Sequence, residues 1–340
     1  KYLKEIFIKK DSENNLVEVL KDSEKINIFD NNFISKIPEN SRIEITHNLK
    51  EICNKYRSKN GDYDCLVPGS GGKDSFYASH ILKYKFNMNP LTVTWAPNIY
   101  TDWGWSNFQA WIHSGMDNYL MTPNGKTHRL LTRLAVDNLL HPFQPFILGQ
   151  KCFAPKMAIK FNIPLIFYGE QEAEYGTPVN EAMSSKRDWT FSSIKERDKM
   201  YFGGISYESL KNDFGLTDTD LSIYIPEDIK NIKSTSLDFR YLGYYLKWHP
   251  QSNYYYAAEH CGFEAAPDRQ EGTYQKYGSI DDRLDGFHWW MAYMKFGICR
   301  TTYDAAHEIR DGHINRDEAV ALVHKYDGEF PQKYWKEFLD

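Results

Sequence analysis

The sequence contains no pair of cysteines at the short spacing that a zinc knuckle or a dithiol centre requires. Its five cysteines are scattered over 340 residues, and they form no C-x-x-C motif. We therefore expect buried, reduced thiols in a cytosolic protein. The five positions are Cys53, Cys65, Cys152, Cys261 and Cys299.

Long apolar segments and an excess of positive charge are also missing. No apolar run approaches the roughly 20 residues of a membrane span, and we find no signal peptide, so we expect a cytoplasmic protein without membrane contact. The net charge is −5, whereas nucleic-acid binding usually needs a basic face, so we expect no nucleic-acid partner. Apolar residues make up 41% of the chain, which is enough for a substantial core.

The pattern along the chain changes twice. Residues 1–60 are polar and lysine-rich and are expected to form an N-terminal extension, with a helix over 46–61. Residues 61–181 alternate apolar strands (63–69, 90–96 and 163–170) with helices (74–86, 126–140 and 153–162). Residues 182–340 form a mixed region for substrate binding or oligomerisation that ends in helices. Alternating strands and helices predict an α/β fold, with a parallel sheet flanked by helices.

The stretch LVPGSGGKDS, residues 66–75, joins an expected strand directly to an expected helix. Glycines at such a junction let an anion approach the free backbone amides of the helix N-terminus. The ATPase loop G-x-x-x-x-G-K-[ST] is excluded, because Val67 and Asp74 stand where it needs glycine and Ser or Thr. The dinucleotide fingerprint fails as well, because Asp74 replaces its last glycine. A phosphate or pyrophosphate site is predicted, and a tight turn without a ligand is the alternative.

The remaining pattern, S-G-G-K-D-S after a strand, resembles the pyrophosphate-binding loop of the PP-loop ATP pyrophosphatases. The resemblance implies an adenine nucleotide alpha hydrolase-like fold, ATP and Mg²⁺ as cofactors, and cleavage of ATP to AMP and pyrophosphate. It places Val93, Thr94 and Trp95 beside the adenine, although an ordinary buried strand explains Val93 and Trp95 equally well. The loop residues that it assigns to the nucleotide are Ser70, Gly71, Gly72, Lys73, Asp74 and Ser75.

Two longer stretches, residues 141–176 and 281–331, resemble the N-acetyl sugar amidotransferase family. The resemblance implies an enzyme that turns a sugar N-acetyl group into an acetamidino group through an O-adenylyl intermediate and ammonia. The implied substrates are nonulosonic acids, such as pseudaminic or legionaminic acid of flagellin glycans, or nucleotide-linked uronic sugars of lipopolysaccharide O-antigens.

The resemblance also implies a set of site residues. Asp74 and Glu170 are expected to hold Mg²⁺, with orientation of the amide and ammonia as a second role for Glu170. Gly149 and Gln150 are expected to lie near the ribose or phosphates. An N-cap role is the alternative for Asp74, and a solvated loop is the alternative for the acidic rim of Glu170, Gln171, Glu172 and Glu174. The expected catalytic residues are Lys73, Asp74, Glu170, Asp282 and Lys295.

Several of these residues have a second interpretation. The resemblance makes Asp282 and Arg283 site candidates, and stabilisation of the N-terminus of the following helix is the alternative for the aspartate. Lys156 and Lys295 are candidates for contacting phosphate groups, with a surface lysine as the alternative for both. Trp103, Trp105 and Trp111 suit either a platform for a sugar ring or a core or subunit interface.

The chain departs from the family at its N-terminus, which lacks the cysteine-rich segment of many members, so zinc is not carried over. No Cys-His-Glu glutaminase set is evident, so we expect ammonia from solution or from a separate pair of glutamine amidotransferase subunits. A homo-oligomer is a further expectation. Two alternatives stay open: a tRNA-modifying PP-loop ATPase and a nucleotide-binding protein without catalysis.

Overall fold

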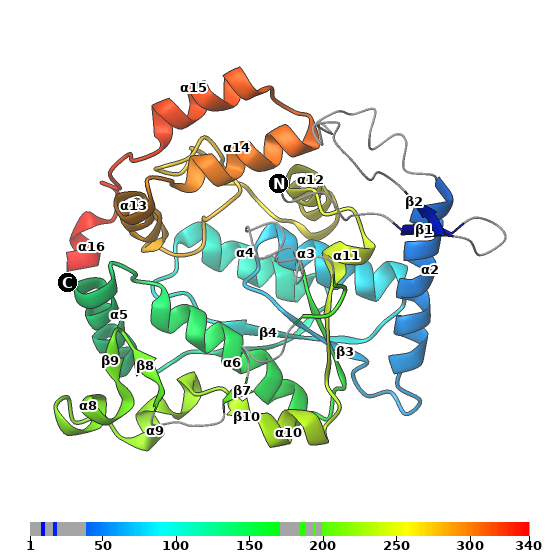
Figure 1. Ribbon diagram of the computed structural model, residues 1–340, viewed down its shortest axis with the longest axis horizontal. Coiled ribbons are helices and arrows are strands. Elements are labelled where there is room, and N and C mark those ends of the chain that lie inside the picture. The colour runs from blue at the N-terminus through cyan, green and yellow to red at the C-terminus, as the bar shows by residue number, and fades with distance from the viewer. Residues whose placement is uncertain are drawn as a thin grey trace.

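The computed structural model describes residues 8–10, 16–18, 39–170, 184–187, 193–194 and 199–339. Its centre is a five-stranded parallel sheet with the strand order β11-β6-β3-β4-β5 (Figure 1). The predicted class, a parallel sheet flanked by helices, is confirmed. The strands are β3 (Cys65–Pro68), β4 (Pro90–Trp95), β5 (Asp117–Met121), β6 (Leu165–Tyr168) and β11 (Asp238–Tyr241).

Helices lie on both faces of this sheet and at its carboxyl end (Figure 1). The longer helices are α2 (Glu39–Tyr56), α3 (Lys73–His80, continued by a π-helical turn at Ile81–Lys85), α4 (Asp102–His113), α5 (Gly125–Leu139), α6 (Gln144–Lys160), α12 (Pro250–Cys261), α13 (Asp285–Phe296), α14 (Arg300–Asp311) and α15 (Arg316–Tyr326). The short ones are α8 (Tyr207–Asn212), α9 (Asp218–Leu221), a 3₁₀ turn at Ser222–Tyr224, α10 (Ile229–Ser234), α11 (Leu242–Tyr245) and α16 (Trp335–Leu339).

Three two-stranded sheets complete the described structure. They are β1 (Ile8–Lys10) with β2 (Leu16–Glu18), β7 (Ser193–Ile194) with β10 (Glu227–Asp228), and β8 (Tyr201–Phe202) with β9 (Ile205–Ser206). The first and last pairs are antiparallel, and the middle pair is parallel.

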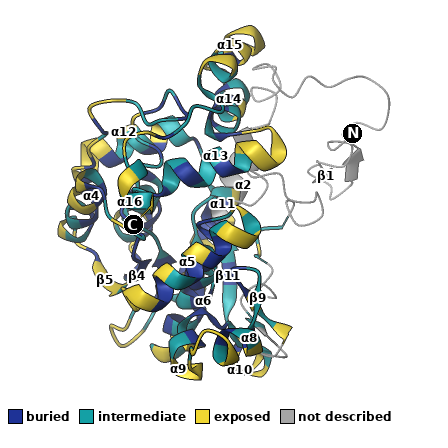
Figure 2. Ribbon diagram, turned by 90° about the vertical axis from the view of Figure 1, so that its left-hand side faces the viewer, coloured by how far each residue is buried: buried dark blue, intermediate teal, exposed yellow. Residues whose placement is uncertain are grey.

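The two faces of the central sheet enter different cores, because successive side chains of a strand point to opposite sides. Val67 of β3 packs with Leu49 of α2 and Ala78 of α3. Leu66, its neighbour in the chain, packs with Ala154 and other residues of α6. Figure 2 shows the buried residues gathered in the sheet and on the helix faces turned toward it. All five cysteines are buried free thiols, as predicted.

The expected elements are confirmed with shifted ends. The helix predicted over 153–162 begins at Gln144, because Pro145 stands in its first turn, where a missing N–H group costs no hydrogen bond. The helix predicted over 46–61 spans Glu39–Tyr56. The edge strands β5 and β11 were not predicted. None of the described helices is long and apolar enough to cross a membrane.

The predicted domain boundaries near residues 60 and 181 remain predictions. Leu49 and Cys53, from the predicted N-terminal extension, belong to the same core as β3 and β6. Strand β11, from the predicted third region, forms an edge of the central sheet.

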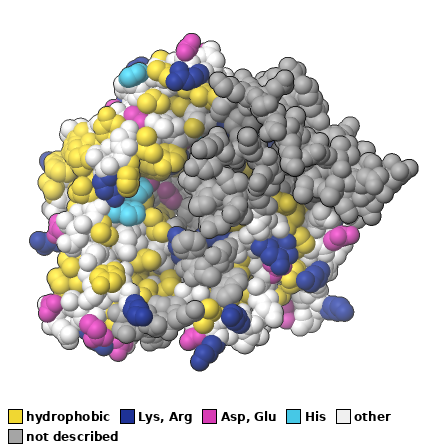
Figure 3. Space-filling model, in the orientation of Figure 1, with side chains coloured by type: hydrophobic (Ala, Val, Ile, Leu, Met, Phe, Trp, Pro, Cys, Tyr) yellow, Lys and Arg dark blue, Asp and Glu magenta, His cyan; other side chains and the backbone are white. Residues whose placement is uncertain are grey.

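Hydrophobic side chains gather at the upper left of Figure 3, near α13, where Met294 and Phe296 are exposed. The expected homo-oligomer remains a prediction.

Candidate functional site

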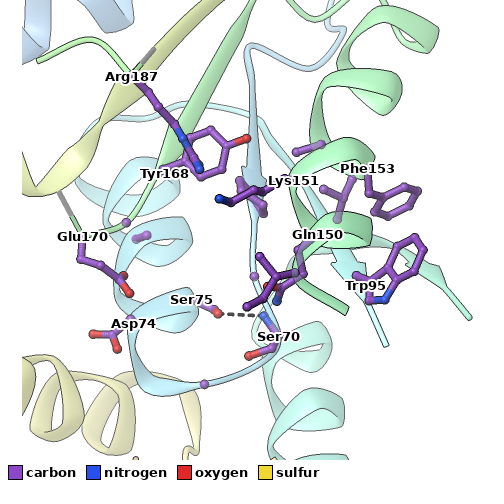
Figure 4. A pocket seen from close by; sticks show the side chains of 18 of the residues that line it. Ser70, Asp74, Ser75, Trp95, Gln150, Lys151, Phe153, Tyr168, Glu170 and Arg187 are labelled. Atoms are coloured by element: carbon purple, nitrogen blue, oxygen red, sulfur yellow. Dashed lines mark hydrogen bonds between the residues drawn. The ribbon is translucent and has the colours of Figure 1, made fainter. Parts of the chain in front are cut away.

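A cavity of about 430 Å³ opens at the carboxyl ends of β3, β4, β6 and β11 (Figure 4). Ligands of open α/β sheets bind at this edge, and the volume is within the range of small-molecule sites. The lining residues come from the loop after β3, from α3 and α6, and from the strand ends. They are Pro68, Gly69, Ser70, Gly72, Asp74, Ser75, Ala78, Val93, Trp95, Ile147, Gln150, Lys151, Phe153, Ala154, Tyr168, Gly169, Glu170, Arg187 and Tyr241.

The glycine loop between β3 and α3 forms one end of this cavity. Gly71 has φ +86° and approaches α4 so closely that a Cβ there would lie 2.7 Å from Phe108 Cα. Glycine is therefore required at this position by both conformation and space. The Ser70 amide donates to Ser75 Oγ over 3.0 Å, which closes the turn at the start of α3 (Figure 4). The N-terminus of α3, with its free amides, thus borders the cavity and suits an anion.

Asp74 and Lys73 are neighbours in the chain and form an ion pair, but only Asp74 lines the cavity. Asp74 lines the cavity, and its Oδ1 accepts a 2.9 Å hydrogen bond from Asn253 Nδ2 of α12. Lys73 is only 8% exposed and lies outside the described cavity lining; its Nζ pairs with Asp74 Oδ2 and lies 5.8 Å from the Tyr277 ring centroid. The predicted contact of Lys73 with a ligand therefore remains a prediction.

Glu170 follows β6 and lines the cavity on the same side as Asp74 (Figure 4). Mg²⁺ is commonly bound by one or two carboxylates together with phosphate oxygens, so these two residues fit such an ion. Within the described parts of the chain, no group of three His, Cys, Asp or Glu side chains could hold a metal by itself. Gln171, Glu172 and Glu174 of the predicted acidic rim lie outside the described residues.

Apolar side chains form another wall of the cavity. Val93 and Trp95 from β4 lie there together with Ile147, Phe153 and Ala154 from α6, a surface suited to an adenine ring. Thr94, by contrast, is fully buried on the other face of the strand, where its Oγ1 accepts a 2.9 Å hydrogen bond from Asn118.

Of the predicted pair Gly149 and Gln150, only one residue lines the cavity. Gln150 lines the cavity, whereas Gly149 packs directly behind it against Trp95. A Cβ on Gly149 would lie 2.2 Å from Trp95 Cζ2. Gly149 therefore allows α6 to approach β4, and the ribose or phosphate contact predicted for it remains a prediction.

Asp282 is 6% exposed and lines a separate, small cavity of about 50 Å³ together with Arg283 and Asp285. It accepts hydrogen bonds from the Asn98 amide nitrogen (2.6 Å), Asn98 Nδ2 (2.8 Å) and the Leu284 amide (2.9 Å). Burial raises the pKa of Asp282 to about 6. Asn98 Oδ1 also forms a 2.7 Å hydrogen bond with His128 Nε2. His128 Nδ1 in turn forms a 2.8 Å hydrogen bond with the Tyr224 hydroxyl. Asp282 is thus part of a buried hydrogen-bond chain that joins distant segments.

Its neighbour Asp281 reaches the loop instead. Burial raises the pKa of Asp281, and a hydrogen bond with the Ser70 side chain acts in the opposite direction. The Thr101 amide donates to the Asp281 carbonyl over 3.1 Å, so this segment is tied to the start of α4 next to the loop. The sequence selected Asp282, whereas the structure brings Asp281 to the glycine loop.

The remaining candidates are not among the residues that line the cavity. Lys295 is exposed, and its Nζ donates to the Leu139 carbonyl over 3.0 Å. Lys156 Nζ donates to the Ser222 carbonyl over 2.7 Å. Trp111 is fully buried and donates to Ser79 Oγ over 2.8 Å. Trp103 packs against the core around Trp111, and Trp105 is 47% exposed; both lie outside the described cavity lining.

Sequence reasoning missed Lys151, Tyr168, Arg187 and Tyr241, which all line the cavity. Lys151 directly follows the predicted Gly149–Gln150 pair, which is the one signal that could have found it. Arg187 lies in a segment with no recognisable pattern and reaches the cavity because residues 184–187 pair with β11.

Comparisons with known proteins add a family match at the C-terminus. Residues 271–340 match the family described as "LPS biosynthesis protein WbpG-like, C-terminal domain". This part contains Asp281 and helices α13 to α16. A 45-residue stretch is 44% identical to the uncharacterized protein MJ1599 of Methanocaldococcus jannaschii, and it covers 13% of this chain and 16% of that relative. The match thus spans about a sixth of the curated relative's length.

Three solved structures are similar at low identity. The NH3-dependent NAD synthetase from Campylobacter jejuni is 10% identical over 53% of this chain and 76% of its own, with a TM-score of 0.30. The NMN synthetase from Francisella tularensis is 12% identical over 85% and 92%, with a TM-score of 0.37. The U34-tRNA thiolase NcsA from Methanococcus maripaludis is 11% identical over 85% and 79%, with a TM-score of 0.31. The fold assignment rests on the strand order and loop described above.

Proposed function

We propose that this chain is an ATP-dependent amidotransferase that converts a sugar N-acetyl group into an acetamidino group. One observation carries the proposal: the glycine loop at the start of α3 opens into a cavity that also presents Asp74 and Glu170. Backbone amides and hydroxyls suit phosphate oxygens, and the two carboxylates suit Mg²⁺. The match of residues 271–340 to an LPS biosynthesis family supports a sugar of a surface polysaccharide as the acceptor.

In this proposal each wall of the cavity has one task. The adenine lies against Val93, Trp95 and the apolar side chains of α6. Ser70, Ser75 and the first amides of α3 hold the β- and γ-phosphates. Asp74 and Glu170 would hold Mg²⁺, which would supply positive charge to neutralise the phosphates. The proposal does not depend on the ligand contacts that the sequence predicts for five residues outside the described cavity lining: Lys73, Thr94, Gly149, Asp282 and Lys295.

The reaction balances as two displacements. The acetamido oxygen attacks the α-phosphorus of ATP, the bond to the bridging oxygen breaks, and pyrophosphate leaves. Ammonia then adds to the acetamido carbon, the C–O bond breaks, and AMP departs with the former amide oxygen. The products are an acetamidino sugar, AMP and pyrophosphate. Proximity and alignment of the amide and the α-phosphorus are the main contribution that a cavity of this kind makes.

The acceptor and the source of ammonia are the finer parts of the proposal. The resemblance of the sequence favours a nonulosonic acid or a uronic sugar carrying an acetamido group. We propose that ammonia comes from a separate pair of glutamine amidotransferase subunits. Activity of the isolated chain with ammonium salt, but not with glutamine, is the result expected from that arrangement.

The fate of the amide oxygen tests the proposal directly. The protein is incubated with ATP, Mg²⁺, ammonium chloride and a panel of acetamido sugars labelled with ¹⁸O in the amide. Mass spectrometry should find ¹⁸O in AMP, and the sugar should carry an NH group in place of the oxygen. Formation of ADP, or AMP without the label, would overturn the reaction. A protein that binds ATP without releasing pyrophosphate with any sugar would be a nucleotide-binding protein without this catalysis.

A further inference from the structure

Transfer of an adenylyl group builds negative charge at the α-phosphate, and cationic side chains commonly stabilise it. The two lysines that the sequence suggests for this task, Lys156 and Lys295, donate to backbone carbonyls elsewhere in the molecule. The structure instead brings two other cationic residues into the cavity, Lys151 and Arg187.

Lys151 and Arg187 reach the cavity from different elements. Lys151 belongs to α6, next to Gln150 and between the apolar residues Ile147 and Phe153 that line the same wall. Arg187 belongs to the segment 184–187 beside β11. In Figure 4 both side chains extend into the cavity at the end away from the glycine loop, with the Tyr168 ring beside them. Two cations directed into one space favour an anion between them.

The position of Arg187 is fixed by both its backbone and its side chain. Its amide donates to the Phe239 carbonyl over 3.0 Å, and the Tyr241 amide donates to the Ser185 carbonyl over 3.1 Å. The guanidinium carbon lies 3.9 Å from the centre of the Tyr168 ring, which is a close cation–π contact. Such a guanidinium loses little freedom when it binds an anion, so the contact is preorganised.

The charges of the cavity are separated into two groups. Asp74 and Glu170 lie beside the start of α3, whereas Lys151 and Arg187 lie across the cavity (Figure 4). In a bound nucleotide the loop would hold the terminal phosphates and the apolar wall would hold the adenine. The phosphate that lies between these two parts of the ligand would then be within reach of the two cations. We infer that Lys151 and Arg187 bind the α-phosphate of the nucleotide; the identity of this ligand rests on the proposed function.

Equilibrium binding of AMP and adenosine tests this inference, because the two ligands differ only in the phosphate group. Calorimetric titrations would use the full chain and the variants Lys151→Gln, Arg187→Gln and Arg187→Lys. Lys156→Gln is the matched control, since it removes the same charge from the same helix at a residue outside the cavity lining. Thermal unfolding of each variant shows whether it is folded.

In the unsubstituted protein AMP should bind at least about tenfold more tightly than adenosine, as charge-assisted contacts to phosphate predict. Lys151→Gln and Arg187→Gln should each remove most of this preference and leave the affinity for adenosine and for pyrophosphate unchanged. Arg187→Lys should keep part of it, because the charge remains and the guanidinium fork is lost. Lys156→Gln should behave as the unsubstituted protein.

An unchanged preference for AMP in folded Lys151→Gln and Arg187→Gln would overturn the inference. Equal losses of affinity for AMP and adenosine would also overturn it, because these residues would then shape the base site. No binding of AMP by the unsubstituted protein would overturn it as well. Failure of the proposed function has a different signature, because normal, charge-dependent AMP binding would then be found without any labelled AMP from acetamido sugars.

Discussion

Asp74 and Asp282 are both aspartates in motifs that the sequence singles out, and the structure gives them opposite surroundings. Asp74 borders an open cavity of about 430 Å³ and stands at the start of a helix beside the glycine loop. Asp282 is 6% exposed, and its carboxylate oxygens accept three hydrogen bonds from Asn98 and Leu284. The difference teaches that two aspartates near helix N-termini can border very different spaces, about 430 Å³ beside Asp74 and about 50 Å³ beside Asp282.

Asp74→Asn is expected to have the largest effect on activity. The substitution removes a negative charge from the proposed Mg²⁺ site and keeps an oxygen that can accept from Asn253. We expect the rate of AMP and pyrophosphate formation to fall by about a hundredfold or more, as for other charge-stabilising groups. The measurement is steady-state pyrophosphate release over a range of Mg²⁺ concentrations. A variant with full activity and unchanged Mg²⁺ dependence would remove Asp74 from the proposed site.

Asp282→Ala should mainly destabilise the fold. It leaves the buried amide of Leu284 and the polar groups of Asn98 without their acceptor, which costs about 2–4 kcal/mol of the free energy of unfolding. Denaturant unfolding measures this loss, and activity per folded molecule should change by less than about threefold, because the residue touches no proposed ligand. Asp282→Asn retains an acceptor oxygen and is the milder control. A stable Asp282→Ala protein without activity would instead support the catalytic role that the sequence suggested.

The pH dependence of stability separates Asp282 from the exposed carboxylates. Its pKa in the folded protein is about 6, raised by burial from 3.8, so the folded state holds the proton more tightly than the unfolded chain. The stabilisation is complete below about pH 4 and is lost as the pH rises through 6. Relative to Asp282→Asn, the unsubstituted protein should lose about 2–3 kcal/mol between pH 4 and pH 7. Parallel stability curves for the two proteins would contradict the raised pKa.

The comparison also shows how far the sequence could lead. The position of the glycine loop was predictable, because an apolar strand, glycines and a helix pattern follow one another within ten residues. The presence of Arg187 across the cavity from the loop was not predictable from the sequence. Arg187 reaches the cavity because its segment pairs with β11, which lies some fifty residues later in the chain. In the same way, pairing of residues 98–101 with 281–283 decides that Asp281 faces the loop and Asp282 does not. Contacts between distant segments leave no local pattern.

Gly149→Ala tests whether the cavity wall depends on close packing of α6 against β4. Glycine in a helix usually costs stability relative to alanine, by about 0.5–1 kcal/mol. Here a Cβ would lie 2.2 Å from the Trp95 ring, so overpacking should reverse the sign and destabilise the protein by about 1–3 kcal/mol. Gly125→Ala is the matched control, because no atom lies within 4 Å of its added Cβ. Equal stability of the two variants in denaturant unfolding would contradict the packing described for Trp95.

Lys295→Gln should have the smallest effect, and this distinguishes it from Lys151. Its side chain is exposed on α13 and donates to the Leu139 carbonyl, away from the described cavity lining. An exposed hydrogen bond of this kind contributes little to stability. We expect the Michaelis constant for ATP and the turnover number to stay within about twofold of the unsubstituted values, as for surface substitutions generally. A tenfold rise in the Michaelis constant for ATP would show that α13 moves toward the nucleotide during the reaction.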